Sequence, residues 1–140
     1  MKLVYSSTSK KAKLMGKKEA RFNEIVRRVR QQYFGKGPEK IKTYFVENIA
    51  ISIIEGNLTP TERFIAQTPE GEEMVHRART KMIQQIYAQK VPEGMEETVG
   101  ARFLYLFSDI KVKEDIAVSV FVFDRKIDDS EDEYPEEEGM

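Results

Sequence analysis

Two segments near the C-terminus restrict the fold more than any other feature, because each is apolar on both faces of the strand that it would form. Residues 101–107 and 116–123 carry large apolar side chains at consecutive positions, which is typical of strands buried on both sides. Such strands need cover on both faces. The side chains are Phe103, Leu104, Tyr105, Leu106 and Phe107 in the first segment and Ile116, Val118, Val120, Phe121, Val122 and Phe123 in the second.

The length of the chain limits how that cover is supplied. With 140 residues, of which 40% are hydrophobic, the chain has the size of one domain with one core. One layer of helices covers one face of a sheet, so we expect the other face to meet a second copy of the protein. A twofold homodimer is the commonest arrangement of this kind.

An amphipathic helix is predicted for residues 17–34. Its apolar residues recur at spacings of three and four, with arginines between them. Gly35 can adopt the left-handed conformation that ends a helix, and Pro38 cannot continue one. The apolar stripe consists of Phe22, Ile25, Val26, Val29 and Tyr33.

A β-hairpin is predicted for residues 41–46 and 49–54, which are rich in β-branched and aromatic residues. Only Glu47 and Asn48 separate the two runs. Asparagine tolerates the positive φ that tight turns require, so this dipeptide is compatible with a turn between paired strands.

Two threonine-proline steps mark the starts of further helices. The Thr59 hydroxyl can accept a hydrogen bond from the backbone N–H of Glu62, and the Glu62 carboxylate can reach back to the N–H of Thr59. Thr68 precedes a longer helix that we expect to run to about residue 90, before Pro92. The buried stripe expected for this helix is Val75, Ala78, Met82 and Ile86.

These elements follow one another in the order helix, hairpin, helix, hairpin. The fold class is therefore α+β, with a four-stranded, mostly antiparallel sheet and helices on one face. We expect a basic, flexible arm at residues 1–18, a single domain at residues 19–125 and an acidic, disordered tail at residues 126–140. The arm carries six lysines and no acid, whereas residues 128–138 carry eight acids and no base.

Cysteine is absent from the chain, so stability comes from packing without disulfide bonds or thiolate metal sites. No run approaches the roughly 18 apolar residues that mark a membrane span, and residues 1–16 lack the apolar middle of a signal peptide. We expect a cytoplasmic protein, at most peripheral to the inner face of the membrane.

Groups suited to catalysis are few. His76 is the only histidine, and a surface ion pair or hydrogen bond with Glu72, four residues earlier on the same helix, accounts for it. Proton or acyl transfer needs a nucleophile beside a base, or two carboxylates with separated pKa values. We expect no enzymatic activity, no catalytic residue and no cofactor.

Asp109 and Asp115 are weak candidates for a metal site. They stand at the two ends of the loop between the last two strands, where their oxygens could bind a hard cation together. The favoured alternative is that Ser108 and Asp109 begin a turn by bonding to their own backbone.

A basic surface around the first helix is the other candidate site, for an anion or a partner. With the lysine-rich arm it suits nucleic-acid phosphates, which predicts salt-sensitive binding. The net charge of −1, the neighbouring acids and the lack of aromatic residues at exposed spacing for base stacking argue against nucleic acid. The residues concerned are Lys36, Lys40, Arg27, Arg28 and Arg30.

Several short motifs stand in a distinctive order along residues 20–125. They are Gly35-Lys36-Gly37-Pro38 with Lys42, Glu55-Gly56-Asn57-Leu58-Thr59-Pro60-Thr61-Glu62, Glu70-Gly71-Glu72 with Arg79, Val99-Gly100, Ser108-Asp109 and the run from Asp115 to Phe123. In their order and spacing, these motifs resemble the MpsC-like family of small bacterial proteins.

The resemblance implies an accessory or regulatory role and supplies no established catalytic residues to assign in this sequence. The family is a domain of unknown function, named after a proposed sodium-translocating system that generates a membrane potential. The resemblance therefore implies a cytoplasmic partner of a membrane ion-transport system. A nucleic-acid-binding regulator that uses the basic arm and first helix is the alternative.

Overall fold

A computed structural model describes the backbone of residues 10–127 and the side chains from residue 16 onward. It confirms the α+β class and the order of the predicted elements. The elements are α1 (Lys10–Phe34), β1 (Lys40–Val46), β2 (Ile49–Glu55), α2 (Pro60–Ile65), α3 (Pro69–Gln89), α4 (Met95–Val99), β3 (Phe103–Lys111) and β4 (Ile116–Phe123).

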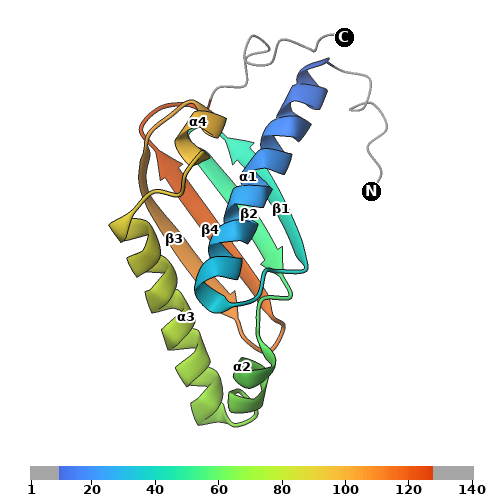
Figure 1. Ribbon diagram of the computed structural model, residues 1–140, viewed down its shortest axis with the longest axis vertical. Helices are drawn as coiled ribbons and strands as arrows, with labels where there is room; N and C mark the ends of the chain where they lie inside the picture. The colour runs from blue at the N-terminus through green and yellow to red at the C-terminus, as the bar shows by residue number, and fades with distance from the viewer. Residues whose placement is uncertain (1–9, 128–140) are drawn as a thin grey trace.

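The four strands form one antiparallel sheet in the order β1-β2-β4-β3. The two hairpins therefore join through their second strands, β2 and β4. Helices α1 and α4 lie across one side of this sheet, and α3 runs beside β3 (Figure 1). We term the side that α1 covers the inner face and the opposite side the outer face.

The core fills the space between the helices and the inner face. Phe22 of α1 meets Phe121 of β4 edge to face, with ring centroids 5.2 Å apart. Tyr87 of α3 contacts the same Phe121 ring at 5.5 Å. Offset and edge-to-face pairs of this kind are the favoured aromatic contacts. Phe121 therefore links both long helices to the sheet.

The predicted helix starts are confirmed by their caps. The backbone N–H of Glu62 donates to Thr59 Oγ1 at 3.1 Å, and the Thr59 N–H donates to Glu62 Oε1 at 2.9 Å. The Thr68 hydroxyl accepts from the N–H of Gly71 in the same way. A Cβ at Gly71 would lie 1.6 Å from the carbonyl oxygen of Ile65, so only glycine lets α2 and α3 approach this closely.

The buried stripe of α3 differs from the predicted one. Ala78 and Met82 are exposed, and the buried positions recur every four residues. The prediction followed apolar side chains alone, whereas this stripe contains an arginine, Arg79, whose charge is paired in the interior. The buried residues of α3 are Gly71, Val75, Arg79, Ile83 and Tyr87.

The domain is longer at both ends than residues 19–125. Helix α1 begins at Lys10, so residues 10–18 of the predicted flexible arm are helical, and Lys18 is buried. Ile127 is also buried, and its N–H donates to the Glu47 carbonyl at 2.8 Å. The rest of the predicted arm and of the acidic tail lies outside the described residues.

Two irregularities set which side chains reach the outer face. In the turn between β1 and β2, Glu47 takes the positive φ of 54°. Asn48 instead donates from Nδ2 to the Phe123 carbonyl at 3.0 Å and ties the hairpin to β4. A register shift between Phe103 and Tyr105 makes a bulge in β3, so Leu104 and Tyr105 are both exposed.

Four hydroxyl groups, which we term the hydroxyl row, cross the inner face. Thr43, Ser52, Ser119 and Ser108 are register partners on adjacent strands, and the first three are almost fully buried. Thr43 and Ser52 are 2.7 Å apart, and Ser108 and Ser119 are 2.8 Å apart. Thr43 also donates to Asn23 Oδ1 of α1 at 2.6 Å. Because these hydroxyls are hydrogen-bonded, they are tolerated in the core.

Candidate functional site

The outer face is an open apolar surface. Its side chains are those of the alternate residues that point away from the helices, and aromatic residues stand toward both edges. Tyr44, Tyr105 and Phe107 are 45%, 52% and 62% exposed. Solitary exposed apolar side chains are normal, but a contiguous patch of this kind marks an interaction site. The apolar residues of the outer face are Tyr44, Val46, Ile49, Ile51, Ile53, Tyr105, Phe107, Ile116, Val118, Val120 and Val122.

The strand register arranges the outer face in four rows that run from β1 to β3. Two rows at one end are wholly apolar, and the two at the other end carry charges. The rows are Val46–Ile49–Val122–Tyr105, Tyr44–Ile51–Val120–Phe107, Lys42–Ile53–Val118–Asp109 and Lys40–Glu55–Ile116–Lys111.

The two edges of the sheet are blunted by side chains from the helices. At β1, the N–H of Thr43 donates to Glu19 at 3.1 Å and the carbonyl of Ile41 accepts from Asn23. At β3, Gln84 of α3 donates to the carbonyl of Leu106 at 3.0 Å. Edge groups that are bonded in this way are poor templates for another strand. A partner that binds the sheet would therefore contact its outer face and not its edges.

A second feature is a cluster of charged side chains where α1, α2, α3 and the ends of β2 and β4 meet. Arg79 donates to both carboxylate oxygens of Glu62, at 2.7 and 2.6 Å, and its guanidinium stacks 3.9 Å from the Phe34 ring centroid. Burial alone would raise the pKa of Glu62, but the hydrogen bonds from Arg79 and Thr59 and the charge of Arg79 lower it. The carboxylate is thus ionised and holds α2 against α3.

Arg30 of α1 is the second buried arginine of this cluster. Its guanidinium donates to Asn57 Oδ1 at 3.1 Å. Burial lowers the pKa of Arg30 to about 10, an effect that the Tyr87 hydroxyl opposes and the nearby charge of Arg79 increases. Arg30 stays charged near neutral pH. It is therefore an interior group, which corrects its predicted place on a basic surface.

Asp115 joins the β3–β4 turn to the segment after β2. Its carboxylate accepts from the N–H groups of Asn57 and Leu58 at 2.8 and 3.2 Å, and it pairs with Arg63 at 3.1 Å. Lys36 donates to the Gly56 carbonyl from the turn after α1. Both residues therefore serve to connect segments that are far apart in the sequence.

The structure does not bring Asp109 and Asp115 together as the suggested metal site, because the two side chains bond to different partners. Asp109 Oδ1 lies 2.6 Å from His76 Nε2, and the hydrogen bond from His76 lowers the pKa of Asp109. His76 thus pairs with Asp109 across the fold and not with Glu72. Among the side chains that the structure describes, no three potential ligands are grouped to hold a metal ion.

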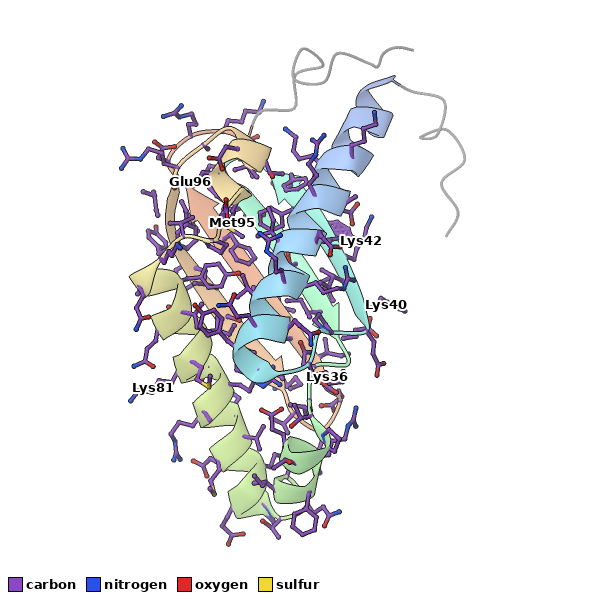
Figure 2. The ribbon with its side chains drawn as sticks, in the orientation of Figure 1. Lys36, Lys40, Lys42, Lys81, Met95 and Glu96 are labelled. Atoms are coloured by element: carbon purple, nitrogen blue, oxygen red, sulfur yellow. The ribbon has the colours of Figure 1, made fainter. Side chains whose placement is uncertain are left out.

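Several of the other predicted basic residues are engaged in contacts within the protomer. Figure 2 shows Lys40 and Lys42 along β1 and Lys36 at the end of α1. Arg27 pairs with Glu24 on α1, and Arg28 donates to the Glu93 carbonyl. The charges of α1 are thus divided among separate contacts.

Enclosed space beside the buried arginines is small. A cavity of about 10 Å³ lies between α3 and the inner face, bordered by Arg30, Arg79, Ser108 and Ala117. This volume is enough for one water molecule. An organic ligand would need the surrounding helices to move.

Sequence reasoning missed the functional potential of the outer face in one respect. It found no aromatic residues at exposed spacing, yet Tyr44, Tyr105 and Phe107 are exposed together. Tyr105 and Phe107 alternate within one strand, a spacing visible in the sequence. Tyr44 joins them only because β1 and β3 are the two edges of one sheet.

The fold and these sites define a single-domain α+β protein whose antiparallel sheet is open on one face. The chain belongs to the MpsC family, because residues 15–125 match the family profile described as "Na+-translocating membrane potential-generating system (MpsC)". This confirms the resemblance seen in the motifs. Within residues 10–127, no helix is long and apolar enough to cross a membrane.

One similar protein is named "Uncharacterized protein YrhF" and comes from Bacillus subtilis (strain 168). It is 60% identical over 118 residues, which cover 84% of this chain and 97% of that protein. No solved structure matches this chain.

Proposed function

We propose that this protein is a non-enzymatic accessory protein that works as a homodimer beside a membrane ion-transport system, on the cytoplasmic side. The observation that carries the binding role is the outer face, where apolar side chains are exposed on β1, β3 and β4 and partly exposed on β2. Association with a membrane system is suggested by the description of the family to which the chain belongs.

The arrangement of polar groups supports binding over catalysis. The charged cluster holds Glu62, Arg79 and Asp115 in contacts that join helices to the sheet. His76 and Asp109 form an exposed pair, with 45% and 73% of their side chains accessible. Neither arrangement places a nucleophile beside a base in an enclosed pocket, which acyl or proton transfer requires.

Co-purification from the membranes of the native bacterium tests the accessory role. The full-length protein is expected to be recovered with an integral-membrane ion transporter, identified by mass spectrometry after crosslinking. The matched variant lacks residues 1–9 and keeps every described helix and strand. Loss of the transporter in that variant alone would assign contact to the N-terminal residues. Absence of any transporter with either protein would overturn the accessory role.

A nucleic-acid-binding regulator is the second candidate, and one specific observation favours it. Tyr44, Tyr105 and Phe107 are exposed on an antiparallel sheet beside Lys40 and Lys42. Stacking of bases on sheet aromatics beside lysines is a common mode of single-strand recognition. Binding of a labelled single strand that weakens steeply with salt would support this function. No binding at low salt would remove it.

A further inference from the structure

We propose that the outer face packs against the outer face of a second copy of the chain in one defined orientation. The twofold axis runs parallel to the strands, between β2 and β4. Strand β1 of each protomer then lies over β3 of its partner. This inference rests on the homodimer proposed above and adds which residues meet across it.

The size of the outer face suits a dimer interface. Strands of seven to nine residues, four abreast, cover about 450 Å² in projection at ordinary strand spacings. Because the side chains project from the sheet, the accessible surface of this face is larger than its projected area. Specific interfaces bury about 800 Å² of accessible surface per partner. Packing two sheets face to face, with strands within about 30° of each other, is a common way to cover such a surface.

The two apolar rows match themselves under this axis. In the row Tyr44–Ile51–Val120–Phe107, an aromatic residue stands at each end and a branched aliphatic residue at each inner position. Rotation about the axis sets Tyr44 over the partner's Phe107 and Ile51 over the partner's Val120. In this row aromatic side chains thus meet aromatic ones and aliphatic side chains meet aliphatic ones. In the row Val46–Ile49–Val122–Tyr105 the axis sets Val46 over the partner's Tyr105 and Ile49 over the partner's Val122, so every contact there is apolar.

The next row provides charge complementarity. Lys42 stands at the β1 end, where it pairs with Glu19 of its own α1 at 3.1 Å, and Asp109 stands at the β3 end, where it bonds to His76 of its own α3. The axis carries Lys42 over the partner's Asp109, and symmetry produces the same pair twice. In the last row Lys40 meets the partner's Lys111 and Glu55 meets the partner's Ile116. This row lies at the end of the sheet, where long charged side chains extend into water.

The other face-to-face twofold axis runs across the strands and is less favourable. It either stacks the apolar rows on the rows that contain Lys42, Asp109 and Glu55, or leaves half of the outer face uncovered. Burying a charge against apolar side chains is costly unless the charge is paired. Charge placement therefore selects the axis parallel to the strands.

A second copy fits the outer face better than a nucleic-acid strand does. The middle of the face consists of branched aliphatic residues on β2 and β4, such as Ile51 and Val120. These side chains interdigitate well with their like but offer bases no flat ring to stack on. The aromatic residues are confined to the two edge strands.

Thiol crosslinking of the full-length protein tests the orientation, since the chain has no cysteine of its own. The variants Lys42→Cys and Asp109→Cys are mixed and treated with a short bis-maleimide, because facing sheets lie about 10 Å apart, beyond the reach of a disulfide. The expected product is a covalent dimer in the mixture and little in either variant alone. Lys81→Cys, at an exposed position on α3 (Figure 2), is the control that should not crosslink.

Each other outcome has a definite meaning. Self-crosslinking of Lys42→Cys alone would show that β1 lies over β1 and would overturn this orientation. A wild-type dimer by light scattering without the Lys42–Asp109 crosslink would overturn the orientation and leave the homodimer standing. If the wild-type protein is a monomer and binds a labelled single strand of nucleic acid, both the orientation and the homodimer are overturned, and the outer face is assigned to nucleic acid. The accessory role is tested separately, by the membrane co-purification.

A charge exchange gives an independent measurement. Lys42→Asp and Asp109→Lys each place two like-charged pairs across the proposed interface. Each should raise the dimer dissociation constant about fivefold to tenfold at low salt, and the double variant should restore it. Equal weakening in the double variant would overturn the pairing, because contacts within one protomer would then explain both effects.

Discussion

The two faces of this sheet both carry many apolar side chains, but only the inner face is covered by helices. On the inner face, Ser52 and Ser119 are buried beneath helices. Beside them on the same strands, Ile51, Ile53 and Val118 point to the outer face, where no described element covers them. The covered face thus holds a row of hydroxyls within an apolar core, and the open face holds aliphatic side chains that no described element covers.

This contrast teaches that hydrophobicity does not reveal which face of a strand is covered within one chain. A buried hydroxyl is tolerated when it has a hydrogen-bond partner, as Thr43 and Ser52 do for each other. An exposed aliphatic surface has no such remedy within the protomer. The inner face is thus covered within the protomer, and the outer face is the surface that the proposed dimer would cover.

The largest predicted effect separates the two faces on strand β2. Ile54 on the inner face is fully buried, and Ile54→Ala should lower the free energy of unfolding by about 4 kcal/mol at any protein concentration. Ile51→Ala on the outer face should destabilise only through the dimer, so its effect should depend on concentration. Urea unfolding at two protein concentrations measures both. If the loss of unfolding free energy in Ile51→Ala does not depend on protein concentration, the outer face does not act through a dimer and the contrast between the two faces fails.

The charged cluster beneath the helices should rank next. Glu62→Gln leaves the Arg79 charge buried without its carboxylate and should cost about 3 kcal/mol of unfolding free energy. The control is Glu73→Gln, which breaks an exposed pair with Arg77 on the same helix and should cost about 0.3 kcal/mol. Equal effects in urea unfolding would contradict the assigned role of the cluster.

The same variant predicts a change in acid sensitivity. The pKa of Glu62 is lowered in the folded state below its ordinary value of 4.5. Its stabilisation is therefore fully present above pH 4.5 and is lost as the pH falls through the folded-state pKa. Glu62→Gln should remove this part of the pH dependence. Unfolding free energies measured from about pH 6 to about pH 3, the range in which carboxylates titrate, test the sign.

The hydroxyl row sharpens the comparison with a smaller effect. Ser119→Ala should cost about 1 kcal/mol, because Ser108 loses its partner in a partly buried site. The double variant Ser108→Ala with Ser119→Ala should cost less than the sum of the two single variants, since no hydroxyl is then left unpaired. Strict additivity in thermal unfolding would show that the hydrogen bond contributes nothing.

The smallest effect concerns the His76–Asp109 pair at the rim of the sheet. His76→Ala should raise the pKa of Asp109 toward its ordinary value of 3.8, because the main cause of the lowered pKa is the hydrogen bond from His76. NMR titration of the Asp109 carboxyl measures this directly. Little change in global stability is expected for so exposed a pair. An unchanged pKa would mean that the pair does not persist in solution.

Local signals in the sequence were enough for the secondary structure. The Thr59 and Glu62 capping pair, the glycine and proline after α1 and the β-branched runs predicted elements that the structure confirms. The apolar character of both faces in β3 and β4 also predicted a sheet with helices on one side. These features depend on residues close together in the chain, so a single sequence contains them.

The charged cluster was beyond sequence reasoning because its members come from distant segments. The buried stripe predicted for α3 did not contain Arg79, and its carboxylate partner, Glu62, lies 17 residues earlier. Asp115 was predicted only as a weak metal-site candidate, and it bonds to backbone N–H groups 58 and 57 residues away. Only the packing of α1, α2 and α3 at one end of the sheet brings these charges together.

The sequence by itself determined the elements, their order and the apolar surplus that one helix layer cannot cover. The tertiary structure decided which side of each strand is covered, because strand order and register place Ser52 beside Ser119 and Ile51 beside Val120. Side chains alternate along a strand, so the sequence shows which residues share a face but not which face is the inner one. The inner face is set by where α1 and α3 pack, and that packing depends on contacts between residues far apart in the sequence, which a local pattern does not show.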